Sequence, residues 1–234
     1  MPEVMIVTGA SRGIGRALSE NYAERGFQVV GCSRGESDFS HSRYRHICLD
    51  VADEGAVVKL VRDVASDYGQ LDALINNAGT ASMNHALLTP MSSVENILRT
   101  NVQGVFLFCR EAAKTMMKAR RGRIVNLATV ATPLRLEGES VYAASKAAVC
   151  SLTEVLAREF GEFGVTVNAV GPTPTDTDLI RGVPREKIDQ LIARQALKRM
   201  CELRDVVNAI DFFLRPDSDF VTGQVLYLGG VPGC

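Results

Sequence analysis

The stretch VMIVTGASRGIG, residues 4 to 15, decides the fold that we expect for this chain of 234 residues. An apolar run with strand character ends in a glycine-rich turn, and a helical pattern begins as the turn ends. Glycines here permit a tight turn and let backbone N–H groups approach a pyrophosphate, which the helix N-terminus attracts. The spacing G-x-x-x-G-x-G therefore predicts phosphate binding, with a plain strand-to-helix turn as the alternative. The residues of this turn are Gly9, Ser11, Arg12, Gly13, Ile14 and Gly15.

Six further apolar runs continue this alternation of strand and helix. The runs are continuously apolar, which is typical of strands buried on both faces of a parallel sheet. We therefore expect one α/β domain over residues 1 to 234, Rossmann-like, with a doubly wound parallel sheet of about seven strands and helices on both faces. The expected strands are 4 to 8, 28 to 32, 46 to 50, 72 to 76, 123 to 128, 165 to 170 and 224 to 228.

One connection is too short for the usual crossover helix. Only SRGESDFSHSRYR, residues 33 to 45, separates the second strand from the third, and it is polar. We expect an abbreviated helix or an irregular loop there.

Charge and composition indicate which classes of partner the protein has. The formal net charge is -1 and the pI is about 6.3, so the chain lacks the basic surface that nucleic acid or an anionic membrane would require. No apolar stretch approaches membrane-spanning length, no signal-like segment opens the chain, and the six scattered cysteines are typical of free thiols in a reducing compartment. The three histidines have no ligand spacing, so no metal site is expected. We predict a cytoplasmic protein whose partners are small molecules or further copies of itself.

The end of the second expected strand indicates which dinucleotide the chain prefers. A carboxylate there would bind the 2'-hydroxyl of NAD, but the chain has Ser33 and Arg34, with Arg12 in the glycine turn. Guanidinium groups suit a 2'-phosphate, so NADP(H) is preferred; solvated surface arginines are the alternative. Asp50, followed by Val51, could accept a hydrogen bond from the adenine amino group or could cap the following helix.

A second stretch, VYAASKAAV, places Tyr142 and Lys146 one helical turn apart, so both side chains leave the same helix face. An ammonium about 4 Å from the phenol, at an effective dielectric of about 20, would favour the phenolate by roughly 4 kcal/mol. That would lower the tyrosine pKa by roughly 2 to 3 units, toward the range where acid–base catalysis works best. An exposed tyrosine beside a snorkelling lysine is the alternative.

The order TGASRGIG, NNAG (76 to 79) and YAASK (142 to 146) resembles the short-chain dehydrogenase/reductase family, specifically its compact single-domain members and ketoreductases such as the 3-oxoacyl-carrier-protein reductases. The resemblance implies a catalytic tetrad of Tyr142 as the acid, Lys146 as its partner and Asn101 on a helix, with Thr129 where the family usually has serine. A threonine keeps the hydroxyl, but its methyl group stiffens the rotamer and takes room from the substrate.

The resemblance also implies how the rest of the site is divided. The strand-ending residues Asn77, Ala78 and Gly79 would let the backbone pass the cofactor. Pro172 and Thr173 stand where the family commonly has Pro-Gly, and Thr175 or Thr177 would contact the carboxamide or the phosphates of the cofactor. A substrate lid is expected over residues 174 to 200 or so.

The function that this resemblance implies is NADPH-dependent reduction of a ketone or 3-oxoacyl-type substrate, possibly linked as a thioester, by hydride transfer with Tyr142 as general acid. Lys146 would also hold the nicotinamide ribose, and Asn101 would hold a water of a proton relay. The alternatives are an NADP-dependent secondary-alcohol dehydrogenase and a catalytically weak NADP-binding regulatory protein. An enoyl reductase is disfavoured, because that branch separates its tyrosine and lysine by more than four residues. Two long helices carry small and apolar residues beyond one face, and a helix of that kind needs two neighbours. The resemblance implies that these faces pair between subunits, so a homotetramer or homodimer is expected; a wider core within one chain is the alternative.

Overall fold

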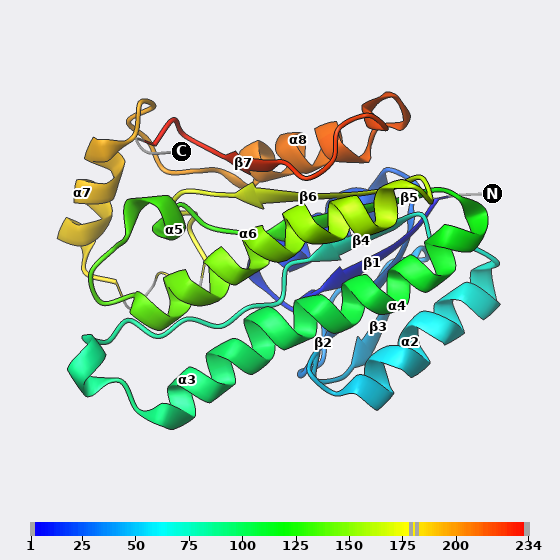
Figure 1. Ribbon diagram of the computed structural model, residues 1–234, viewed down its shortest axis with the longest axis horizontal. Helices are drawn as coiled ribbons and strands as arrows, with labels where there is room; N and C mark the ends of the chain where they lie inside the picture. The colour runs from blue at the N-terminus through cyan, green and yellow to red at the C-terminus, as the bar shows by residue number, and fades with distance from the viewer. Residues whose placement is uncertain (1–2, 178–179, 181–182, 232–234) are drawn as a thin grey trace.

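The computed structural model describes residues 3–177, 180 and 183–231, and these residues form one parallel sheet covered by helices (Figure 1). The sheet has seven strands in the order β3-β2-β1-β4-β5-β6-β7, and every neighbouring pair is parallel. The order reverses between β1 and β4, where doubly wound sheets open a crevice for ligands at the carboxyl ends of their strands. The strands are β1 (Val4–Thr8), β2 (Gln28–Ser33), β3 (Tyr44–Cys48), β4 (Ala73–Asn76), β5 (Gly122–Leu127), β6 (Val165–Gly171) and β7 (Val225–Tyr227).

Helices cover both faces of the sheet. On one face, shown toward the viewer in Figure 1, lie α2 (Glu54–Tyr68), α4 (Gly104–Ala119) and α6 (Ser140–Gly161). The opposite face packs against α1 (Gly13–Glu24) and α8 (Leu203–Leu214). The remaining helical segments are η1 (Ala86–Leu88), α3 (Met91–Leu98), η2 (Arg99–Gln103), α5 (Ala131–Leu134), α7 (Arg185–Arg194) and η4 (Pro216–Ser218).

Alternate residues of each strand feed two separate hydrophobic cores, which is why the strand sequences are apolar throughout. In β1, Ile6 packs toward α2, α4 and α6, whereas Met5 and Val7 pack toward α1 and α8. All three are fully buried. The predicted doubly wound fold is confirmed, and each expected strand is present within two residues of its expected bounds.

The short connection between β2 and β3 holds no helix, as the sequence predicts. Strand β3, however, begins at Tyr44, two residues earlier than expected, because Tyr44 already pairs with Val29 of β2. The Tyr44 ring packs against Phe39, with ring centroids 4.7 Å apart. Phe39 in turn lies under the guanidinium of Arg16 on α1, 4.9 Å from the ring centroid. Aromatic and cation–π packing therefore replaces the missing helix.

None of the helices in the described ranges is both long and apolar enough to cross a membrane.

Candidate active site

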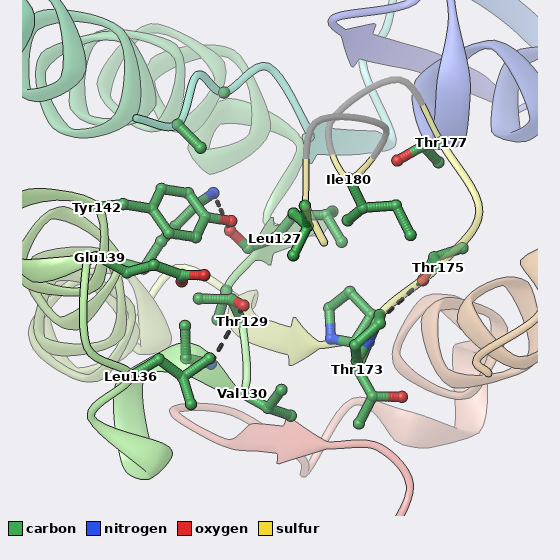
Figure 2. Close-up of a pocket in the computed structure, with 18 of the residues that line it drawn as sticks. Leu127, Thr129, Val130, Leu136, Glu139, Tyr142, Thr173, Thr175, Thr177 and Ile180 are labelled. Carbon is green, nitrogen blue, oxygen red and sulfur yellow. Dashed lines mark hydrogen bonds between the residues drawn. The ribbon is translucent and has the colours of Figure 1, made fainter. Parts of the chain in front are cut away.

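One cavity of about 160 Å³ lies at the carboxyl ends of the strands and contains most of the predicted catalytic residues. Figure 2 shows Tyr142, Thr129 and Glu139 on one wall, and Thr173, Thr175 and Thr177 on the opposite wall. Ile14, Asn77, Gly79 and Lys146 also line it. Motifs that are far apart in the sequence meet here because parallel strands deliver their carboxyl ends to one edge.

The glycine turn has the close approach that a phosphate cradle needs. Gly9 and Gly13 adopt positive φ angles of 69° and 57°, which L-residues rarely adopt. A Cβ on Gly15 would lie 2.2 Å from the carbonyl oxygen of Gly9, so no side chain fits there. Helix α1 begins at Gly13 with no acidic residue in its first turn.

Asn77 holds the turn in place rather than facing outward. Its side-chain amide donates to the carbonyl oxygens of Thr8 (2.9 Å) and Gly9 (3.2 Å). The Thr8 hydroxyl accepts hydrogen bonds from the backbone N–H groups of Asn77 and Ala78. The end of β4 is thereby tied to the glycine turn across the switch point of the sheet.

At the end of β2, the Ser33 hydroxyl donates to the carbonyl oxygen of Gly35 at 2.7 Å and lies 3.1 Å from Nε2 of His46. Tyr44 completes this cluster, with its hydroxyl 2.7 Å from Nδ1 of His46. Arg34 is exposed at the same place. The hydroxyl of Ser33 therefore holds the backbone of the loop after β2, and the exposed guanidinium of Arg34 is the positive charge at this end of the strand.

One interpretation of the sequence was that Asp50 caps the following helix, and this interpretation is wrong. Asp53 caps this helix, by accepting the backbone N–H of Ala56 at 3.1 Å. Asp50 instead accepts the N–H of Ala52 and forms an ion pair with Arg99 at 2.9 Å. The side chain of Val51 is buried against Gly104, where a Cβ would come within 2.8 Å of it, so Val51 belongs to the core.

Tyr142 and Lys146 both lie buried on α6 and face the cavity, but their electrostatics differ from the prediction. Burial raises the pKa of Tyr142 to about 12, and a hydrogen bond with Thr129 opposes that rise. The expectation that Lys146 lowers the tyrosine pKa is therefore wrong for the chain by itself. Burial also lowers the pKa of Lys146 to about 8, and its ammonium donates to the carbonyl oxygen of Leu127 at 2.6 Å. Desolvation is the largest cause of both pKa shifts.

Asn101 lies in η2, a π-helical turn between α3 and α4. Such turns inside helices are frequent at functional sites. Its side chain is buried and makes three hydrogen bonds: Nδ2 donates to the carbonyl oxygen of Thr80 and to the hydroxyl of Ser145, both at 2.9 Å, and Oδ1 accepts the N–H of Thr80 at 2.8 Å. Asn101 thus links the segment after β4 to the catalytic helix. Both side-chain N–H donors are thereby used, while Oδ1 keeps a second lone pair as an acceptor.

The segment after β6 is anchored to the end of β5, because Val130 donates its N–H to the carbonyl oxygen of Pro172 at 3.3 Å. The Thr175 hydroxyl turns back to the carbonyl oxygen of Thr173 at 3.0 Å. Thr177 lies beside the glycine turn, 3.7 Å from the place of a Cβ on Gly13. Of the two predicted threonines, Thr177 is therefore the one next to the phosphate cradle.

The expected lid contributes apolar walls. Ile180, Val183, Ile188 and Leu191 line the cavity, the last two from α7. Two described cations of this region lie on its surface: Arg185 pairs with Asp189, and Arg199 pairs with Asp205.

Ser145 and Glu139 are polar residues at the site that the sequence analysis did not indicate. Ser145 bonds to Asn101, and Glu139 lines the cavity one turn before Tyr142. The spacing of Glu139 and Tyr142, three residues apart at a helix start, was the available signal.

Comparison with known proteins agrees with this fold. A family model described as Enoyl-(Acyl carrier protein) reductase matches residues 9–230. The chain belongs to the short-chain dehydrogenase/reductase family, whose members are oxidoreductases.

Within that family, the chain is 32% identical to the 3-oxoacyl-[acyl-carrier-protein] reductase FabG of Vibrio cholerae, an alignment that covers 97% of this chain and 96% of the relative. It is 31% identical to the FabG of Escherichia coli, with the same coverage. Among solved structures, "ElxO with NADP Bound" superposes with a TM-score of 0.89 at 26% identity over 97% of each chain. The aldohexose dehydrogenase of Thermoplasma acidophilum, in ligand-free form, also gives 0.89, at 30% identity over 98% of this chain and 93% of that one.

Proposed function

We propose that the protein is an NADPH-dependent reductase of ketones, and that substrates of the 3-oxoacyl type are among the candidates. The observation that carries the proposal is the meeting of Tyr142, Thr129 and Lys146 at one cavity, whose opposite wall reaches the glycine turn. The FabG relatives are named as reductases of 3-oxoacyl groups on a carrier protein, which supports a carbonyl as the reacting group. The four-residue spacing of Tyr142 and Lys146 favours ketone over enoyl reduction.

The residues present fit NADP(H). Gly9, Gly13 and Gly15 leave a cradle that a Cβ would fill, α1 begins there without an acid, and Arg34 stands exposed at the end of β2, where an acid would select NAD. The NADP-bound neighbour supports the same choice. Arg12 and Arg34 would hold the 2'-phosphate, Lys146 the nicotinamide ribose, and Thr177 a phosphate oxygen.

The chain's own groups would perform the proton chemistry, while the bound NADPH supplies the hydride. The raised pKa of Tyr142 keeps the phenol protonated at neutral pH, so it can donate to the substrate oxygen as negative charge develops there. The hydroxyl of Thr129 would hydrogen-bond to the same oxygen. The ammonium of Lys146 would stabilise the tyrosinate that remains.

Asn101 is proposed as a positioning residue, because its bonds to Thr80 and Ser145 hold the segment after β4 against α6. Pairing with further copies stays a prediction, and exposed Phe106 on α4 and Val155 on α6 are the surface that supports it.

The test measures NADPH oxidation by the purified protein with cyclic ketones, sugar-derived ketones and 3-oxoacyl thioesters. The readout is the loss of NADPH absorbance. The proposal expects turnover with at least one ketone and far slower turnover with NADH. Cofactor binding without turnover of any substrate would favour the regulatory alternative.

A further inference from the structure

Glu139 occupies an unusual position at the start of the catalytic helix. It is the N-cap residue of α6, where an acid commonly turns back to accept backbone N–H groups, yet its side chain makes no capping hydrogen bond. Figure 2 shows its carboxylate pointing into the cavity, on the wall that carries Tyr142 and Thr129. Helix capping therefore does not explain this acid.

The carboxylate also lacks a hydrogen bond or ion pair to any described residue, although the side chain is half-buried. Burial raises its pKa, and the attraction of Lys187, an exposed residue of α7, opposes that rise. The negative charge in turn acts to raise the pKa of Tyr142. Removing water from an unpaired carboxylate is costly, and a donor from a ligand would offset this cost.

The surroundings indicate which ligand group reaches Glu139. Among the described residues that line the cavity, Glu139 and Lys146 carry charge, and Lys146 already donates to Leu127. The walls near Glu139 are apolar and include Val130 and Leu136. A cationic substrate would meet the ammonium of Lys146, and an anionic one would meet the carboxylate. A neutral hydroxyl group can donate a hydrogen bond to the Glu139 carboxylate and is repelled neither by that carboxylate nor by the Lys146 ammonium.

From this geometry we propose that Glu139 is a specificity-determining residue that accepts a hydrogen bond from a hydroxyl group close to the carbonyl being reduced. The inference rests on the proposed function and narrows its substrates to neutral hydroxyketones. An acyl thioester would place a carbonyl oxygen, which is an acceptor, where the carboxylate requires a donor. Thioesters and keto acids are therefore disfavoured.

The test compares hydroxyacetone with 2-butanone, which differ by a hydroxyl in place of a methyl group, under saturating NADPH. In Glu139→Leu, the ratio of kcat/KM values for the two ketones should fall roughly 10- to 100-fold relative to the wild type, the usual range for a hydrogen bond to a charged group. Glu139→Gln, whose amide can donate, should raise kcat/KM for the N-acetylcysteamine thioester of acetoacetate by about tenfold. Glu137→Gln removes an exposed charge two residues away and should leave both values unchanged. A ratio that stays within about twofold in Glu139→Leu would overturn the proposal.

A binding experiment separates this inference from the proposed function. Propane-1,2-diol and butan-2-ol, the corresponding alcohols, are titrated into the NADP-loaded protein by calorimetry. The wild type should prefer the diol, and Glu139→Leu should lose that preference. Equal binding of the two alcohols by the wild type would contradict the role of Glu139. A diol preference in a protein that reduces no ketone would instead overturn the reductase and leave the hydroxyl site standing.

Discussion

The ammonium of Lys146 lies 2.6 Å from the carbonyl oxygen of Leu127, the last residue of β5, and donates a hydrogen bond to it. The bond joins the N-terminal third of the catalytic helix to the carboxyl end of β5 and holds a buried cation at the cavity that both residues line. One side chain therefore has both a structural and a chemical role. Burial lowers the pKa of Lys146, so the stability of the fold should depend on pH. Its structural role can therefore be measured by unfolding, separately from its role in catalysis.

Lys146 should make the protein more stable as the pH rises from neutral. Its pKa falls from 10.5 in the unfolded chain to about 8 in the fold, so between these values the unfolded state binds more protons and stability increases with pH. The gain should be about 2 kcal/mol from about pH 7.5 to about pH 9.5. Urea unfolding gives the free energy of unfolding of the wild type and of Lys146→Met at each pH. The difference between the two proteins isolates the contribution of Lys146, because the cysteines and tyrosines titrate in both. Lys59→Met, at an exposed lysine, is the control and should behave like the wild type. Equal pH slopes for the wild type and Lys146→Met would contradict the lowered pKa.

Tyr142→Phe should lower kcat for ketone reduction by at least about a hundredfold, because the developing alkoxide loses its proton donor. NADPH affinity and melting temperature should change little, since the phenol bonds only to Thr129 among the described side chains that influence its pKa. Steady-state kinetics and fluorescence titration with NADPH provide the two readouts. Tyr68→Phe changes a partly exposed hydroxyl on α2 and serves as the control. Full activity in Tyr142→Phe would remove Tyr142 as the acid.

Thr129 should act through its hydroxyl rather than its methyl group. Thr129→Ser keeps the donor and should retain kcat within a few-fold, while widening the range of accepted ketones because the methyl group is gone. Thr129→Val keeps the shape and should lose about a hundredfold in kcat, the usual loss for one oxyanion donor. The comparison of kcat for these two variants with one ketone decides the point. A valine variant as active as the serine variant would contradict the assignment.

Arg34→Ala should weaken NADPH binding by roughly 10- to 100-fold, because a charge-assisted contact to the 2'-phosphate is lost. NADH lacks that phosphate, so its dissociation constant should stay nearly the same. Fluorescence titration with both coenzymes tests this, with Arg62→Ala, an exposed arginine of α2, as the control. Equal losses for the two coenzymes would remove the phosphate-recognition argument.

Gly15→Ala should disrupt the phosphate cradle. Its Cβ would lie 2.2 Å from the carbonyl oxygen of Gly9 and 2.3 Å from the amide nitrogen of Asn77, so the turn must shift. Overpacking of this kind costs about 1 to 3 kcal/mol, and NADPH affinity should fall at least about tenfold. Gly161→Ala adds the same methyl group where nothing lies within 4 Å, so its affinity should match the wild type. Wild-type affinity in Gly15→Ala would show that the turn does not hold the coenzyme closely.

The amino-acid sequence by itself determined the elements and their order. Continuous apolar runs specify strands buried on both faces, and only a parallel sheet with helices on each side buries them. Gly9 and Gly13 adopt backbone angles that other residues rarely adopt. The turn after β1 could therefore be predicted from the sequence alone. The spacing of Tyr142 and Lys146 placed both on one face of a helix. These features depend on local dihedral angles and periodicity, which the chain carries along its length.

Tertiary structure decided the environment of each group. The pKa of Tyr142 rises because packing removes water from the phenol, and the partner of Asp50, in the loop after β3, is Arg99 of η2. The partners of Asn101 are Thr80 and Ser145, and the carboxylate of Glu139 faces the cavity instead of its own helix end. Desolvation and long-range partners depend on which surfaces meet when the sheet and helices pack. No local pattern contains that information.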